Sequence, residues 1–310
     1  MSESGATRAR TALFSALFLF CLTPYASPPV ALALGLGLAL TVGHPWRSRN
    51  ARVVKYLLQF SVVGLGFGMN LGEVLAAGRT GVSFTAISIF GTLTAGRLIG
   101  KWLKIERTTS HLISSGTAIC GGSAIAAMAP ILNAGEKEIS VSLGTIFILN
   151  SVALFLFPPI GHYLGLNQTQ FGMWAAIAIH DTSSVVGAAA HYGPEALKLA
   201  TTVKLTRALW ILPISFGAVL LFKNKSAKVS PPYFIFFFAA ASLFVSAFPG
   251  FTGFYSEMVG AAKTGLTVTL FLIGAGLSRA AIKAVGVRPV LQGVMLWALI
   301  SSVSLFAVTR

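Results

Sequence analysis

Acidic residues are scarce in this sequence. Only 8 of its 310 residues are Asp or Glu, against 23 Lys and Arg, and charged residues make up 10% of the chain. A soluble globular domain carries roughly 25% charged residues, so this composition excludes an ordinary soluble protein. Because 55% of the residues are hydrophobic, the sequence predicts an all-α polytopic membrane protein, with residues 1–310 forming a single transmembrane domain.

Motifs that would indicate other classes of protein are absent too. The two cysteines, Cys21 and Cys120, both fall in apolar segments, which excludes a disulfide framework and a cysteine-based metal site. No G-x-x-x-x-G-K-[ST] phosphate-binding loop occurs, so we do not expect this chain to drive transport with ATP. The first apolar run lacks a small-residue cleavage site and is expected to begin the membrane domain.

The formal net charge of +15 has two explanations, nucleic-acid binding or basic membrane loops. The cations gather between apolar runs, at residues 47–55, 101–107, 223–228 and 279–288. If the chain crosses the bilayer about eleven times from a cytoplasmic N-terminus, all four clusters lie on the cytoplasmic side, as the positive-inside rule requires. We therefore expect a multi-pass protein of the bacterial inner membrane, embedded in the lipid bilayer, with no nucleic-acid partner.

Two apolar segments are interrupted near their centres by small and polar residues. The first covers residues 112–133 with its break at 117–123, and the second covers residues 171–191 with its break at 179–184. Each is about as long as a transmembrane helix, roughly 20 residues, and unwound backbone at that depth must face protein or water. Paired interrupted helices indicate a transporter's binding site, and we expect them to cross side by side at the midplane.

A glycine pattern indicates an internal repeat. Gly66-x-Gly68 recurs as Gly274-x-Gly276, on two predicted spans that start from opposite sides of the bilayer. Inverted repeats of this kind are usual in secondary transporters, although a chance match among 32 glycines is the alternative. The two interrupted cores, residues 119–127 and 179–189, also resemble each other but imply a different repeat frame.

Three motifs resemble the YeiH-type sulfate exporter family. They are GTAICGGSAIAA at residues 116–127, HDTSSVVGAA at 180–189 and VKLTRALW at 203–210. The resemblance covers nearly the whole chain and implies ten or eleven helices, with distant kinship to the bile-acid symporter and sodium/proton antiporter fold. It also implies a core subdomain, here including about residues 112–222, and panel-like helices from the remainder. The substrate stays open.

Asp181 is the only aspartate in the chain and lies within the second break. A carboxylate near the bilayer centre is costly unless it is paired, hydrated or protonated, so Asp181 is a candidate coupling site for H⁺ or Na⁺. The alternative is structural, because Asp before Thr-Ser-Ser is good N-cap chemistry for a half-helix. The neighbouring His180 titrates near neutrality when unperturbed and is either a ligand or a packed histidine.

Lys204 and Arg207 lie three residues apart and therefore on one face of the predicted eighth span. They are too deep for easy snorkelling to the interface. These cations are expected to bind an anionic substrate, to pair with Asp181 in a brace, or to do both.

Hydroxyl groups and glycines around the breaks complete the expected site. Free N–H groups at half-helix N-termini suit an anion, and glycine lets a substrate approach the backbone, although serine also packs membrane helices without any substrate. The candidate substrate-binding residues are Ser115, Thr117, Cys120, Gly121, Gly122, Ser123, His180, Thr182, Ser183, Ser184, Lys204 and Arg207, with Asp181 as the ion-coupling residue.

Taken together, these features favour a secondary transporter of a small anion, coupled to H⁺ or Na⁺ and working by alternating access. A passive anion channel is the alternative, although two unlike interrupted helices fit alternating access better than a ring of like residues. An intramembrane enzyme would need a nucleophile and a base within reach of each other. We expect no enzymatic activity, no metal and no cofactor other than the coupling ion, and a homodimer is left open.

Overall fold

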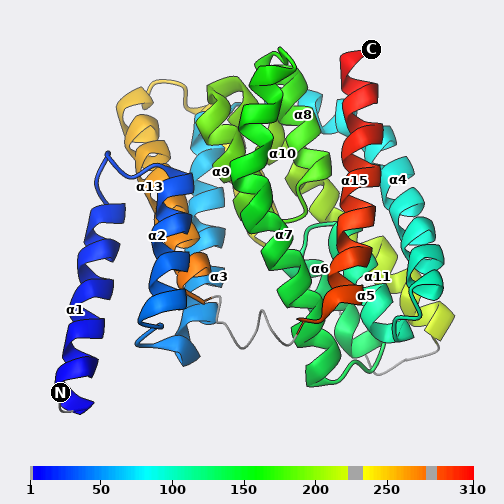
Figure 1. Cartoon of the computed structure of the whole chain (residues 1–310). Coiled ribbons are helices and arrows are strands. Elements are labelled where there is room, and N and C mark those ends of the chain that lie inside the picture. The colour runs from blue at the N-terminus through cyan, green and yellow to red at the C-terminus, as the bar shows by residue number, and fades with distance from the viewer. Residues whose placement is uncertain (1–2, 223–232, 277–284) are drawn as a thin grey trace. The chain divides into compact units, whose positions relative to one another are not determined.

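A computed structural model of the chain describes residues 3–222, 233–276 and 285–310 (Figure 1). Every regular element within these ranges is a helix. Four helices there are long and apolar enough to cross a membrane, namely Lys137–Tyr163, Pro194–Phe222, Thr252–Gly276 and Val287–Thr309. The predicted class, an all-α membrane protein, is confirmed.

The chain forms two compact units, residues 1–74 with 234–280 and residues 75–233 with 281–310. The first unit is built from α1 (Glu3–Cys21), α2 (Pro28–Thr41), α3 (Arg47–Leu65), the short 3₁₀ helix η1 (Gly66–Gly68), α12 (Tyr233–Ala247) and α13 (Thr252–Gly276). The second is built from α4 (Leu71–Trp102), α5 (Arg107–Ala118), α6 (Gly122–Ile131), α7 (Glu136–Tyr163), α8 (Gln168–Ala178), α9 (Thr182–Tyr192), α10 (Pro194–Leu209), α11 (Ile211–Phe222) and α15 (Val287–Thr309). The second unit includes all of residues 112–222.

Glycines bring helix backbones into contact in the first unit. A Cβ added at Gly35 of α2 would lie 2.1 Å from the carbonyl oxygen of Phe271 in α13, and one at Gly274 would lie 2.5 Å from that of Leu32. No larger residue fits at either position without separating the two helices. This close approach is how helices associate in lipid, where the hydrophobic effect between them is absent.

Helix α3 packs against α13 and runs antiparallel to it. Near its start, Asn50 donates from Nδ2 to the carbonyl of Leu272 at 2.8 Å, whereas near its end Gly64 faces Ala262. The second copy of the glycine pattern lies at the end of α13, and the first forms η1, directly after α3, which runs antiparallel to α13. Residues 277–279, which follow the second copy, fall outside the described residues.

Helix α7 is the axis of the second unit, and both predicted interruptions lie beside it. The first separates α5, which ends at Ala118, from α6, which begins at Gly122. The second separates α8, which ends at Ala178, from α9, which begins at Thr182. The predicted breaks at 117–123 and 179–184 are thus confirmed.

Each interrupted segment turns back at its break, so the expectation that both continue across the membrane is wrong. In the second segment, the rings of Phe171 and Tyr192 stack with their centroids 3.7 Å apart, although 21 positions separate them. The first and last turns of this segment therefore lie side by side, next to Gly161 near the end of α7. We call residues 168–192 hairpin B.

The first segment doubles back along the other half of α7. The Ser142 hydroxyl of α7 donates to the carbonyl of Thr109 at 3.4 Å, and a Cβ at Gly116 would lie 3.2 Å from Ile146. After the break, Gly122 lies beside Phe147, and α6 then returns towards the start of α7. The reversal requires Gly121, whose φ of +69° suits a residue without a side chain. We call residues 107–131 hairpin A.

The hairpins enter from opposite ends of α7 and meet near its middle. In Figure 1, α5 and α6 lie toward the lower end of α7, while α8 and α9 lie toward its upper end. Helix α10 returns along α8, since a Cβ at Gly172 would lie 2.9 Å from the carbonyl of Ala196, and it carries Lys204 and Arg207 to the hairpin tips. Helix α11 then continues beside α6, where Ile214 and Val219 pack on the core of hairpin A.

Candidate functional site

The tips of the two hairpins touch. A Cβ added at Gly121, in the turn of hairpin A, would lie 3.2 Å from the Cβ of Asp181, in the turn of hairpin B. The amide of Asp181 also donates to Oδ1 of Asn150, at the middle of α7, at 3.2 Å. The predicted juxtaposition of the two breaks is confirmed, and α7 holds it in place.

Arg207 joins the two tips. Its Nε donates to the carbonyl of Ala118 in hairpin A at 2.7 Å, and its Nη1 donates to that of Ile177 in hairpin B at 3.0 Å. Both carbonyls belong to the last turns of half-helices, where intrahelical partners are missing and the helix dipole leaves about half a negative charge. The fully buried guanidinium is therefore a C-cap shared by α5 and α8.

Lys204 caps only hairpin B. Its Nζ donates to the carbonyl of Ile179 at 2.7 Å and to that of Ala176 at 3.3 Å. The predicted brace is not formed, since among the described residues neither Lys204 nor Arg207 makes an ion pair with Asp181. The carbonyls at the C-terminal ends of α5 and α8 accept hydrogen bonds from the two cations instead.

Asp181 is the N-cap of α9. Its Oδ2 accepts the amide of Ser183 at 3.1 Å and also the Ser183 hydroxyl. The structural alternative stated for this residue is therefore confirmed as geometry, whereas its role in ion coupling stays a prediction. Asp181 is half-buried, while the adjacent His180 is 1% exposed.

Gly121, the N-cap of α6, has no side chain to accept the first N–H groups of the helix. Gly122 is half-buried and Ser123 is exposed. Ser123 is therefore the one predicted ligand that the fold turns away from the buried cluster. The predicted ligands that are buried are Ser115, Thr117, Cys120, Gly121, His180, Thr182, Ser183, Ser184, Lys204 and Arg207.

The formal charges at the tips come from Lys204, Arg207 and Asp181. Two helix C-termini and two helix N-termini also meet there, and their partial charges of about one half each cancel. With both cations protonated and Asp181 ionised, the formal charges sum to one positive charge.

Several buried side-chain atoms at the tips lack a hydrogen-bond partner among the described residues. They are Oγ1 of Thr117, Nδ2 of Asn150, both ring nitrogens of His180 and Nη2 of Arg207. Buried polar groups are nearly always paired, and unpaired ones are typical of places that a ligand or water fills. Each of these four residues either makes a hydrogen bond at the hairpin tips or is adjacent in sequence to a residue that does.

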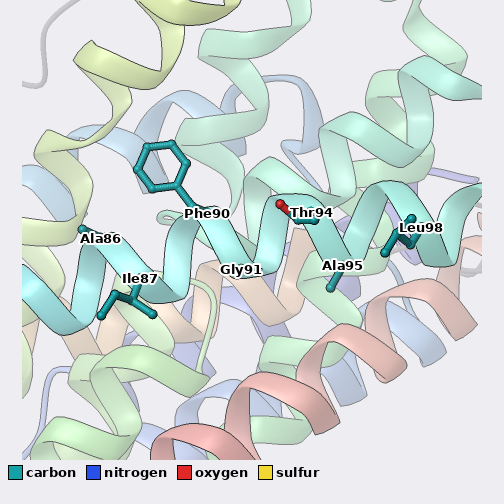
Figure 2. A pocket seen from close by; sticks show the side chains of 7 residues that line it. All are labelled: Ala86, Ile87, Phe90, Gly91, Thr94, Ala95 and Leu98. Atoms are coloured by element: carbon teal, nitrogen blue, oxygen red, sulfur yellow. The ribbon is translucent and has the colours of Figure 1, made fainter.

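A hollow elsewhere in the second unit has a different character. Figure 2 shows that it is lined by one face of α4, with Ala86, Ile87, Phe90, Gly91, Thr94, Ala95 and Leu98. None of these side chains is charged, and none is a predicted ligand. The hollow is an apolar helix face and not an anion site.

The profile of a family described as conserved hypothetical protein 698 matches residues 15–293. The chain belongs to this family. A UPF0324 membrane protein of Bacteroides thetaiotaomicron is 58% identical over 279 residues, covering 89% of this chain and 84% of the relative. One from Porphyromonas gingivalis is 58% identical over 290 residues, covering 91% and 87%, and one from Geobacter sulfurreducens is 50% identical over 298 residues, covering 96% of each. No solved structure matches the chain.

These relatives confirm the family resemblance drawn from the three motifs, and with it a membrane location for this UPF0324 family member. Their names state no substrate. Among the described residues, no three of His, Cys, Asp and Glu gather in a way that could hold a metal ion.

Two buried amides in this UPF0324 chain escaped the sequence analysis. Asn150 holds the tip of hairpin B, and Gln292 of α15 donates from Nε2 to the carbonyls of Gly96 and Ser110 at 3.0 and 3.2 Å. The signal was available, because each is an isolated amide within an apolar run. An intramembrane polar residue is by default a candidate for function or for helix association.

Glu106 anchors the outer end of hairpin A. Its carboxylate caps α5 by accepting the amides of Thr108 and Thr109 at 2.7 and 2.6 Å. Partial burial acts to raise the pKa of this carboxyl, but the hydrogen bonds from Thr109 and Thr108 outweigh burial and hold the pKa below its ordinary value. The hairpin therefore begins from a cap that stays ionised at neutral pH.

Proposed function

We propose that this chain is a secondary transporter of a small anion, coupled to H⁺ or Na⁺ and working by alternating access. One observation carries the proposal: two hairpins reach the middle of α7 from opposite ends, and their tips meet around Arg207. Transporters place substrate and ion sites near the midplane, where broken helices expose dipole ends. The two buried cationic side chains at the tips, Lys204 and Arg207, favour an anion, and the carboxylate of Asp181 is suited to exchange a proton or Na⁺.

We further propose an architecture of about eleven membrane segments. Nine would cross the bilayer, with α10 and α11 counted as one, and the two hairpins would enter without crossing. The pairing of hairpin A with α7 and of hairpin B with α10 supports an inverted repeat, as does the antiparallel packing of α3 and α13. The second unit would be the core and the first the panel, in a bacterial inner membrane with a cytoplasmic N-terminus, and the assembly would be a homodimer.

Flux in sealed proteoliposomes tests the transport function. Saturable accumulation of a labelled anion, driven by a pH or Na⁺ gradient and abolished by collapsing that gradient, is the expected result. Counterflow of labelled against unlabelled anion should also occur, because exchange needs no net ion movement. A passive anion channel would dissipate gradients without accumulating anion, and that outcome would overturn the proposal. Enzymatic turnover is not expected, since the carboxylate bonded to the Ser183 hydroxyl is engaged as the N-cap of α9, and His180 bonds to no hydroxyl among the described residues.

A further inference from the structure

Asn150 lies at the point where α7, hairpin A and hairpin B converge, and it is 3% exposed. Its side chain has two ends with different surroundings. Oδ1 accepts the amide of Asp181 at 3.2 Å, while Nδ2 is buried and has no hydrogen-bond partner in the part of the chain that the structure describes. The identity of the two ends follows from chemistry, because only the oxygen can accept from an N–H group.

The geometry points to Asn150 as both a positioning residue for Asp181 and a direct ligand of the transported anion. This inference rests on the proposed transport function and assigns it a residue on α7. Oδ1 fixes the backbone of Asp181 and hence the carboxylate that caps α9. Nδ2 is bonded to the same carbon as Oδ1 and therefore lies within about 6 Å of the Asp181 amide nitrogen. This distance is comparable to the diameter of a small anion.

The unpaired nitrogens of Asn150 and Arg207 have the same hydrogen-bonding chemistry. Nη2 of Arg207 is a donor only, and Nδ2 of Asn150 is a donor only, so both are satisfied by a hydrogen-bond acceptor. Arg207 links both hairpins and Asn150 links hairpin B to α7, so an anion held by the two would contact each moving part of the site. Occupancy by the anion would then be felt directly at Asp181.

The substitution Asn150→Asp separates the two roles of this side chain. It preserves the shape and the acceptor for the Asp181 amide, but it replaces the Nδ2 donor with an oxygen that repels an anion. Asn150→Leu removes both the acceptor and the donor at similar volume. Thr145→Val is the matched control, since Thr145 is buried on the same helix and its hydroxyl bonds only to the carbonyl of Val141 at 2.9 Å.

Binding is measured as thermal stabilisation of each purified protein by sodium salts of chloride, acetate, phosphate and sulfate at matched ionic strength. At least one anion should stabilise the unaltered protein and Thr145→Val with the same half-saturating concentration. Asn150→Asp and Asn150→Leu should raise that concentration at least tenfold. In Asn150→Asp alone, the pH midpoint of stabilisation should also move upward, because two adjacent carboxylates retain a shared proton to higher pH.

Each outcome has one meaning. If Asn150→Asp binds the anion as well as the unaltered protein at every pH, the inference is overturned and the transport function stands. If Asn150→Leu fails to fold, Asn150→Asp still tests the loss of the donor. If no anion stabilises the unaltered protein saturably and no flux occurs in proteoliposomes, both the inference and the proposed function fail.

Discussion

At the scale of single residues, Lys204 and Arg207 look alike in the sequence but have different surroundings. Lys204 donates only to carbonyls of hairpin B, whereas Arg207 spans both hairpins and keeps Nη2 unpaired. The ammonium of lysine is a compact point charge, while the planar guanidinium can hold two carbonyls and an anion at once. Both side chains were predicted from the sequence to bind an anion, and the unpaired Nη2 makes Arg207 the stronger candidate.

Lys204→Met should therefore act mainly on stability, and Arg207→Lys mainly on binding. Lys204→Met leaves two buried carbonyls unpaired, each at a cost of about 1–3 kcal/mol, and should lower the Tm with little change in half-saturating anion concentration. Arg207→Lys keeps the charge but cannot bridge Ala118 and Ile177, and it should raise that concentration at least tenfold, about 1.4 kcal/mol. Equal losses of affinity in both variants would contradict this division.

Asp181 carries a second residue-scale prediction. Asp181→Asn preserves the shape of the side chain and an oxygen that can accept the Ser183 amide, but it removes the titratable charge. The variant should fold and reach the membrane, lose accumulation driven by a pH or Na⁺ gradient, and retain exchange of labelled for unlabelled anion. The measurement is paired uptake and counterflow in proteoliposomes with matched protein content. Gradient-driven uptake equal to that of the unaltered protein would rule out ion coupling at Asp181.

At the scale of elements, the sequence located the breaks but not their direction. Gly121 and the polar run from His180 to Ser184 stand out against apolar neighbours, so both interruptions could be predicted. Whether the chain continues or reverses depends on long-range contacts, such as the stack of Phe171 on Tyr192 and the bond from Ser142 to Thr109. Local sequence patterns carry no information about such pairs.

A cross-linking experiment tests the reversal in hairpin B. With Cys21 and Cys120 replaced by alanine, Phe171→Cys and Tyr192→Cys should be joined by a thiol cross-linker about 10 Å long, because the native rings stack. In a segment that continued as a helix, 21 residues would separate the thiols by roughly 30 Å. The linked peptide is identified by mass spectrometry, with each single-cysteine protein as the control. Efficient labelling of both cysteines without any cross-link would contradict the hairpin.

At the scale of the whole molecule, the distribution of cations could be predicted, but the path of the chain between them could not. If hairpin A turns back instead of crossing, the loops that follow it move to the other side of the membrane. Hairpin B also turns back and returns the later loops to their original side, so only the loops at the two ends of α7 change sides. Every other loop keeps the side that an eleven-span count gives it. The positive-inside rule is therefore satisfied equally well whether hairpins A and B turn back or cross the membrane as full spans.

The two topologies differ most sharply in the second unit, at the two ends of α7. If the hairpins reverse, Lys137 lies on the same side of the membrane as Lys101 at the end of α4, and Leu164 lies on the opposite side. If both segments continued across, Lys137 and Leu164 would exchange sides. All three residues are exposed, so Lys101→Cys, Lys137→Cys and Leu164→Cys can be compared in a background without Cys21 and Cys120. A membrane-impermeant maleimide applied to intact cells, and then to cells with opened membranes, should modify Leu164→Cys from outside and the other two only after opening. Labelling of Lys137→Cys from outside, with Leu164→Cys protected, would show that both segments cross the membrane. The hairpin tips on which the proposed transport mechanism depends would then not exist.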